Sequence, residues 1–281
     1  MQAQTKGFAA EILPKRKEDV NLDFQFKDRY DINDLLRIME ILRSENGCPW
    51  DREQDHRSIR KDFLEEVYEV CEAIDLDDSE LMKEELGDVL LQVVFHARIE
   101  EEKGNFTFAD SVNDVCQKLI VRHPHVFGDV TVADSGEVLK NWNDIKQQTK
   151  HQETYTETLR SVCTALPALM RAQKTGKRAR RAGLDFPDAE AALRSLESEI
   201  AKVRAAKTPE NEAEELGDML FAAVNAVRLK GYDAEELLTR ATDKFTDRFE
   251  KTENLVRCEG KDMRSLDINT LDAYWQKAKK Q

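Results

Sequence analysis

Apolar residues recur at helical spacing over much of this chain. In the first clear stretch they stand three or four positions apart, at Ile59, Phe63, Val67, Val70 and Ile74. After a polar break at 75–79 the spacing resumes, at Leu86, Leu90, Val93 and Ala97, and it ends near Gly104. Such spacing places the apolar side chains on one face of a helix. The pattern therefore predicts two antiparallel helices joined by a short turn.

Further helices are expected at 31–44, 108–121, 137–149 and 159–181. The segment EELGDVLLQVVFHAR at 84–98 recurs in outline as EELGDMLFAAVNAVR at 214–228. Other residues match between the two halves in the same order: Lys118 with Lys244, Arg122 with Arg248, Trp142 with Trp275, and Lys146 with Lys279. Two copies indicate a duplication. We predict an all-α protein with a polar arm at 1–30 and two tandem helical bundle domains, at 31–152 and 153–281.

Carboxylates gather on the predicted hairpin. Glu66 and Glu69 are three residues apart on the first helix, and Glu85 and Asp88 are three apart on the second. Residues at this spacing share one face of a helix. A turn centred at Asp77 sets Glu69 opposite Glu85 and Glu66 opposite Asp88. The four carboxylates are therefore expected to converge.

Carboxylates this close repel one another unless a cation lies among them. Oxygen ligands alone point to Mg²⁺, or to Mn²⁺, and not to zinc. Mg²⁺ usually shares its remaining positions with water and substrate phosphates, so a phosphorylated substrate is expected. Lys118, Arg122 and Lys146 are candidates for holding a triphosphate. Glu65 is a candidate for positioning or deprotonating the attacking water.

Charge and cysteine content narrow the classes of function. The net charge of −13 argues against a general binder of DNA, RNA or membrane surfaces. The five cysteines are scattered without a C-x-x-C pair, which favours neither disulfides nor zinc and suits the cytoplasm. The longest apolar stretch, at 89–97, is far below the roughly 20 residues of a membrane span. The first residues contain no apolar signal segment.

The ordered set of motifs resembles a known family. EE-x-x-E at 65–69, E-x-x-D at 85–88 and GCPWDREQ at 47–54 are similar to the signature of MazG-type all-α nucleoside triphosphate pyrophosphohydrolases. The resemblance implies hydrolysis of an NTP or dNTP to the monophosphate and diphosphate, with Mg²⁺ activating water at the α-phosphorus. It also implies a homodimer or larger assembly.

Carried over position by position, the family's metal ligands fall on four carboxylates: Glu66, Glu69, Glu85 and Asp88. Glu65 stands beside them. The matching basic and aromatic positions are Lys118, Arg122, Trp142 and Lys146. Trp50 and Trp142 are candidates for stacking on a nucleobase, although packing roles explain both equally well. Nothing in the motifs selects a base or sugar, so broad use of NTPs and dNTPs is expected.

The second copy departs from this pattern. A turn at 208–209 sets Glu199 opposite Asp218 but puts Lys202 opposite Glu215, and Ser198 stands in the place of Glu65. An ammonium group then occupies a ligand position, and a Lys202–Glu215 pair is expected to replace the metal. We predict that the second site is weakened or inactive.

Two other functions remain open from the residues alone. A non-catalytic sensor or scaffold would bind the Mg-nucleotide without turnover. A carboxylate-bridged redox bundle would need two E-x-x-H motifs, and the chain offers only Glu53 to His56. The basic run at 174–181 is interpreted as a solvated helix end at the entrance to the second domain.

Overall fold

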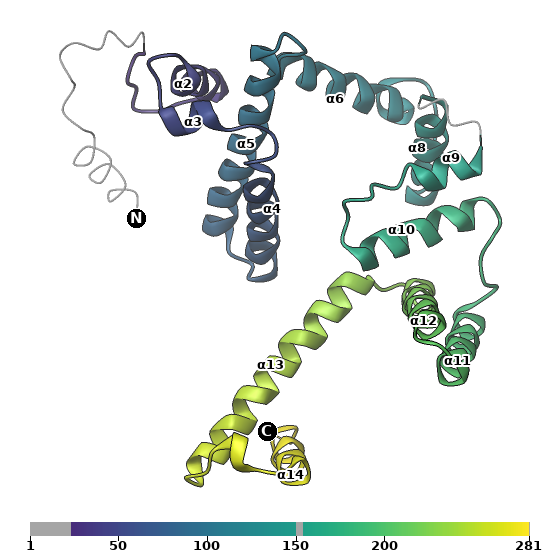
Figure 1. Cartoon of the computed structure of the whole chain (residues 1–281). Helices are drawn as coiled ribbons and strands as arrows, with labels where there is room; N and C mark the ends of the chain where they lie inside the picture. The colour runs from purple at the N-terminus through teal and green to yellow at the C-terminus, as the bar shows by residue number, and fades with distance from the viewer. Residues whose placement is uncertain (1–23, 150–153, 281) are drawn as a thin grey trace. The chain divides into compact units, whose positions relative to one another are not determined.

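The computed structural model describes residues 24–149 and 154–280, which form helices and contain no strand (Figure 1). The predicted all-α class is confirmed. Most of the predicted arm at 1–30 and the domain boundary predicted at 152/153 lie outside the described residues. The chain divides into two compact units between Val138 and Leu139, within one helix.

Unit 1 contains the predicted helical hairpin. Its helices are α2 (Ile32–Arg43), α3 (Pro49–Glu53), α4 (Arg60–Asp75), α5 (Ser79–Glu102), α6 (Phe108–Arg122), α7 (Pro124–Phe127) and the start of α8 (Ser135–Thr149). The turn between α4 and α5 is tight because Asp77 adopts a left-handed conformation, with φ of 54°. Asp78 then caps α5 by accepting hydrogen bonds from the backbone N–H groups of Glu80 and Leu81, at 3.0 and 3.1 Å.

The core of unit 1 lies on the C-terminal half of α5. Its buried side chains come from α2, the start of α4 and this half of α5, and they are Met39, Ile59, Val94, Phe95 and Ile99. Arg43 of α2 adds an ion pair to Glu102 at 2.8 Å. The N-terminal half of α5 packs instead against α4, whose only buried residue is Ala73. The core therefore fixes one half of α5 and leaves the other half accessible for chemistry.

Unit 2 repeats the hairpin. Besides the rest of α8 it contains α9 (Tyr155–Arg160), α10 (Ala168–Arg181), α11 (Ala189–Ala205), α12 (Pro209–Leu229), α13 (Ala234–Cys258), a 3₁₀ turn (Met263–Ser265) and α14 (Ile268–Ala278). Thr208 caps α12 and Pro209 occupies its first position, where a missing N–H costs nothing. The single helix expected at 159–181 is wrong: α9 and α10 are separate helices, and Pro167 precedes α10 because it cannot continue an earlier one.

A buried polar network fixes α10 within unit 2. The Gln173 side chain donates to Asp233 at 3.1 Å and accepts from the backbone N–H of Ala234 at 2.9 Å. On the next turn, Gly176 lies directly against α12, where Arg228 forms an ion pair with Asp185 at 2.5 Å. These contacts set which face of α10 is buried.

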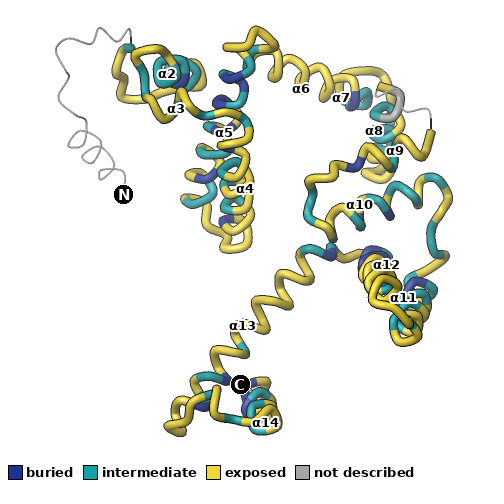
Figure 2. The backbone as a smooth tube through the Cα atoms, in the orientation of Figure 1, coloured by how far each residue is buried: buried dark blue, intermediate teal, exposed yellow. Residues whose placement is uncertain are grey.

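Buried positions are sparse along α4, α6 and α13, which Figure 2 shows mostly as exposed or intermediate. Many of the exposed residues on these helices are large and apolar. No helix among the described residues combines the length and apolar character required to cross a membrane.

Replacing Gly176 tests the close approach of α10 to α12. A Cβ atom there would lie 2.7 Å from Asn225 Oδ1 and 2.9 Å from Arg228 Nε, and the Arg228–Asp185 pair keeps these groups from moving aside. We expect Gly176→Ala to lower the free energy of unfolding by about 1–3 kcal/mol in urea titrations. Thr175→Ala, one position earlier, should change it by less than about 0.5 kcal/mol. Equal stability of the two variants would contradict this packing.

Candidate metal centre on the first hairpin

Three carboxylates of the first hairpin meet at one point. Glu66 comes from α4, and Glu85 and Asp88 come from successive turns of α5. One oxygen from each lies within 4.8 Å of the other two. Glu69 lies one turn after Glu66, outside this group of three, but its charge contributes to raising the pKa values of both Glu66 and Glu85. The antiparallel hairpin thus brings together acids that are 22 residues apart in the sequence.

The crowding changes the acid–base behaviour of the group. Partial burial and then the charges of Asp88 and Glu69 raise the pKa of Glu66. Partial burial, followed by the charges of Glu69 and Asp88, also raises the pKa of Glu85. Glu85 is only 9% exposed. Each of these carboxylates therefore carries a cost when it is ionised without a nearby cation.

This donor set fits a hard divalent cation. All the donor atoms are carboxylate oxygens, which suit Mg²⁺ or Mn²⁺ better than softer metals. No lysine or arginine of the described residues forms an ion pair with Glu66, Glu69, Glu85 or Asp88. A cation among them would relieve the repulsion that raises their pKa values. Their role as metal ligands remains a prediction, now with a geometry that suits it.

The remaining charged candidates of unit 1 are Glu65 on α4 and two cations on α6. Glu65 adjoins Glu66 in sequence but is exposed. Lys118 is exposed and Arg122 is buried, both on α6. The C-terminal end of α5 lies about 21 Å along that helix from Asp88, at roughly 1.5 Å per residue. The helix α6 begins beyond this end and leads away from α5 (Figure 1). Within one unit, the structure does not bring these two cations to the carboxylates.

The aromatic candidates differ in exposure. Trp50 is 58% exposed on α3 of unit 1. Trp142 and Lys146 are half-buried on the part of α8 that belongs to unit 2. Their contact with nucleotide remains a prediction.

The second hairpin keeps three carboxylates and adds a lysine. Oxygens of Glu199, Glu215 and Asp218 also lie within 4.8 Å of one another. The Lys202 ammonium group lies 2.9 Å from Glu199, on its own helix. The expected pair with Glu215 is therefore wrong, because the i,i+3 partner on α11 is closer. Hydrogen bonding to Glu199 chiefly raises the pKa of Lys202, and the charges of Glu215 and Asp218 add to the effect.

Sequence reasoning overlooked one polar cluster of unit 1. His56, before α4, lies 2.7 Å from His96 and 2.5 Å from Glu100, both on α5. Hydrogen bonds from Lys103 and His56 lower the pKa of Glu100 to about 2. His96 and Glu100 stand four residues apart, a spacing visible in the sequence, but His56 joins them only through the fold. The cluster ties the segment before α4 to the core half of α5.

Comparisons with known proteins show a family to which the chain is similar. The family model described as the MazG nucleotide pyrophosphohydrolase domain matches residues 54–127, which include all four carboxylates. The chain is 44% identical over 246 residues to the nucleoside triphosphate pyrophosphohydrolase/pyrophosphatase MazG of Thermotoga maritima, covering 88% of this chain and 94% of that protein. It is 41% identical over 256 residues to a nucleoside triphosphate pyrophosphohydrolase of Escherichia coli K12, covering 89% and 97%.

Metal binding at this site should depend on pH. The pKa values of Glu66 and Glu85 are raised above the usual value of a glutamate. As pH rises and these groups lose their protons, repulsion among the ionised carboxylates lowers the stability of the metal-free fold. Mg²⁺ competes with protons for the same oxygens. We expect Mg²⁺ to raise the thermal unfolding midpoint more at pH 8 than at pH 5.5.

Glu85→Gln should abolish most of this rise, whereas Glu72→Gln, at an exposed position on α4, should preserve it. A Mg²⁺ effect of equal size at both pH values, or one that survives Glu85→Gln, would count against the site.

Proposed function

The chain belongs to the family of MazG nucleoside triphosphate pyrophosphohydrolases, and we propose that it hydrolyses NTPs and dNTPs to monophosphate and diphosphate at the first hairpin. The convergence of Glu66, Glu85 and Asp88, beside Glu69, is the observation that supports the first hairpin as the place of this reaction. The family assignment favours an enzyme over the alternative of a non-catalytic sensor.

We assign Mg²⁺ as the metal, held by Glu66, Glu69, Glu85 and Asp88, with Mn²⁺ as a substitute. Bound there, the metal would neutralise phosphate charge and make water more acidic. The four carboxylates would hold the cation in a partly buried place. Mg²⁺ usually shares its remaining coordination positions with water and with the oxygens of substrate phosphates.

In the proposed reaction, water attacks the α-phosphorus and the bond from that phosphorus to the oxygen bridging toward the β-phosphorus breaks. The bridging oxygen leaves with the diphosphate, and the attacking oxygen stays on the monophosphate. Glu65 is exposed beside the ligands and is assigned as the acceptor of the proton from water. An exposed carboxylate can pass this proton on to solvent.

Triphosphate binding is assigned to Lys118, Arg122 and Lys146, with Trp142 and Trp50 as stacking surfaces for the base. Cations with these long side chains can neutralise the phosphate oxygens farthest from the metal. Stacking on an aromatic face accepts any base, which agrees with broad use of NTPs and dNTPs.

A second copy of the chain offers a way to bring α6 to a hairpin. Val112, Val115 and Leu119 form an i, i+3, i+7 stripe on α6, and each is at least 40% exposed. The hairpin itself leaves Leu64, Val67 and Leu86 at least 40% exposed. Apolar surfaces of this kind mark association sites in water. We propose a homodimer in which the α6 stripe of one copy covers the α4–α5 hairpin of the other.

Loss of the stripe should separate the copies. We expect Leu119→Lys to convert a dimer to a monomer in sedimentation experiments at micromolar concentration, and to reduce turnover because α6 no longer reaches the hairpin of its partner. Leu139→Lys is the matched control, since Leu139 is also exposed but belongs to unit 2. A monomeric unmodified protein with full turnover would contradict the assembly.

We propose that the second hairpin does not catalyse the reaction. Lys202 supplies there the positive charge that a metal supplies in the first, and it stands 2.9 Å from Glu199. A divalent cation would have to displace this ammonium group.

Product analysis tests where catalysis takes place. Purified protein with Mg²⁺ and a set of NTPs and dNTPs should release diphosphate and monophosphate in equal amounts. Glu69→Gln should lower kcat by about a hundredfold or more, as for loss of electrostatic stabilisation at a reaction centre. Glu215→Gln, at the position of α12 that matches Glu85 of α5, should leave kcat within about twofold.

Turnover lost only in Glu215→Gln would move the reaction to the second hairpin. Nucleotide binding without any products from the unmodified protein would instead support the sensor.

A further inference from the structure

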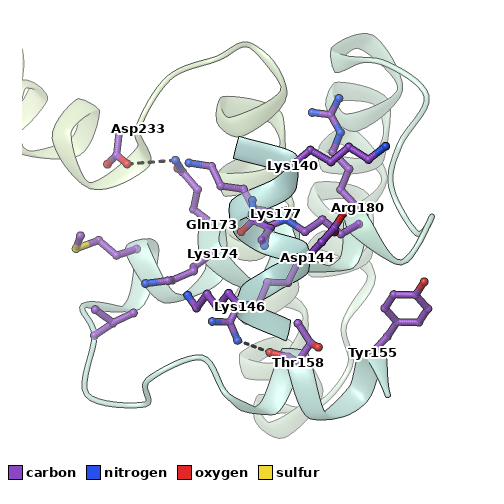
Figure 3. A pocket seen from close by; sticks show the side chains of 15 residues that line it. Lys140, Asp144, Lys146, Tyr155, Thr158, Gln173, Lys174, Lys177, Arg180 and Asp233 are labelled. Atoms are coloured by element: carbon purple, nitrogen blue, oxygen red, sulfur yellow. Dashed lines mark hydrogen bonds between the residues drawn. The ribbon is translucent and has the colours of Figure 1, made fainter. Parts of the chain in front are cut away.

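Unit 2 contains a large cavity between α8, α9 and α10. No residue of the α11–α12 hairpin lines this cavity. Its volume is about 1020 Å³, which is at the upper end of the range for small-molecule sites. Its wall carries Lys140 and Lys146 from α8 and Lys174 and Lys177 from α10 (Figure 3). The cavity also includes Arg178, Arg180 and Arg181, against only two acidic residues, Asp144 and Asp233.

The charge of this wall is opposite to that of the chain. The whole protein has a formal charge of −13, yet the cavity gathers seven cations around one space. Asp233 is engaged by Gln173 at 3.1 Å, so one of its oxygens already has a partner. Among the described residues, no ion pair involves Lys174, Lys177 or Arg181. The cavity therefore has an excess of positive charge that its own residues do not neutralise.

The cations of α10 share a single face. Lys174, Lys177, Arg178 and Arg181 stand at positions i, i+3, i+4 and i+7, which lie above one another on a helix. Like charges at this spacing destabilise an isolated helix. The negative end of the helix dipole accounts for Arg178 and Arg181 in the last turn. It does not account for Lys174 and Lys177, which precede that turn.

The rest of unit 2 fixes this basic face in place. Gln173 is 4% exposed and joins α10 to the start of α13, while Gly176 is buried against α12. Arg178 is held from the other side, because it donates to Ser161 Oγ at 2.6 Å and to the backbone oxygen of Thr158. Burial and the charge of Arg181 lower the pKa of Arg178, as expected for cations that crowd one another. Lys174, Lys177, Arg180 and Arg181 are exposed, as expected for a solvated helix end, whereas Arg178 is partly buried and held by these contacts.

We propose that this cavity binds an anion with several phosphate groups, in a manner that does not require a metal. Lys174 and Lys177 provide the central charges, and Lys140 contacts the same anion from α8. A single phosphate has too few oxygens to contact cations spread along two turns of α10, whereas a chain of phosphates can contact several of them at once. Tyr155, which is 56% exposed at the cavity, is placed to meet a base if the phosphates belong to a nucleotide.

This inference does not rest on the proposed catalysis at the first hairpin. Of the described residues, the carboxylate groups that could hold a metal lie on the two hairpins, and none of their members lines this cavity. The cavity is therefore assigned to binding alone. An anion bound there would be retained when divalent cations are removed.

Calorimetric titration with tripolyphosphate in the presence of EDTA tests the site on the full chain. We expect one binding event per chain that weakens as salt is added, because phosphate contacts with lysines are screened. The double variant Lys174→Ala/Lys177→Ala should weaken binding by roughly tenfold or more, as for loss of two hydrogen bonds between charged groups.

The control Arg171→Ala/Arg204→Ala also removes two exposed cations from unit 2, one of them on α10, but neither residue lines the cavity. It should leave the affinity within about twofold, since surface charges farther away are largely screened. Circular dichroism of both double variants checks that the helices remain. The Glu69→Gln variant should bind tripolyphosphate like the unmodified protein, which separates this site from the proposed metal centre.

Pyrophosphate and ATP titrated under the same conditions identify the source of the phosphates. Tighter binding of ATP than of tripolyphosphate would support the site and indicate a nucleotide, and equal binding would support it and indicate an oligophosphate. No binding of any of the three, or equal weakening by both double variants, would overturn the proposal. A short single-stranded RNA bound more tightly than all three would also overturn it.

Discussion

Repulsion among the carboxylates of the first hairpin is the constraint on which the proposed account depends. Glu66 and Glu85 are partly buried beside Asp88 and Glu69, and their raised pKa values reflect that crowding. A fold gains nothing from such an arrangement in the absence of a cation. The helix packing maintains it because the core of unit 1 fixes the other half of α5 through Val94, Phe95 and Ile99. The C-terminal half of α5 therefore stabilises the fold. Its N-terminal half carries carboxylates whose repulsion lowers stability and which suit the binding of a cation.

The second hairpin shows another solution to the same electrostatic problem. Glu199, Glu215 and Asp218 are as close together as their counterparts, but Lys202 lies among them and its ammonium group compensates part of their charge. A fixed cation on a side chain stabilises the hairpin without a metal. The duplicated unit thus retains the shape of a metal site while its charge suits a structural role.

Sequence patterns were sufficient for the local features and insufficient for the assembly of the site. Helical spacing and the Asp77 turn predicted α4, α5 and the pairing of their carboxylates, because those contacts are set within one hairpin. The break before α10 and the pairing of Lys202 with Glu199 were missed, since each depends on which of several close partners the packing favours. The basic cavity was missed because the stripe on α10 has meaning only opposite the lysines of α8. The position of α6 relative to the hairpin could not be predicted either, because local spacing does not determine it.

The location of the metal tests the central claim most directly. Crystals grown with Mn²⁺ in place of Mg²⁺, measured near the manganese absorption edge, reveal the ion by its anomalous scattering. Strong peaks are expected among Glu66, Glu69, Glu85 and Asp88, and no comparable peak is expected beside Lys202 in the second hairpin. Peaks confined to Glu199, Glu215 and Asp218 would contradict the central claim.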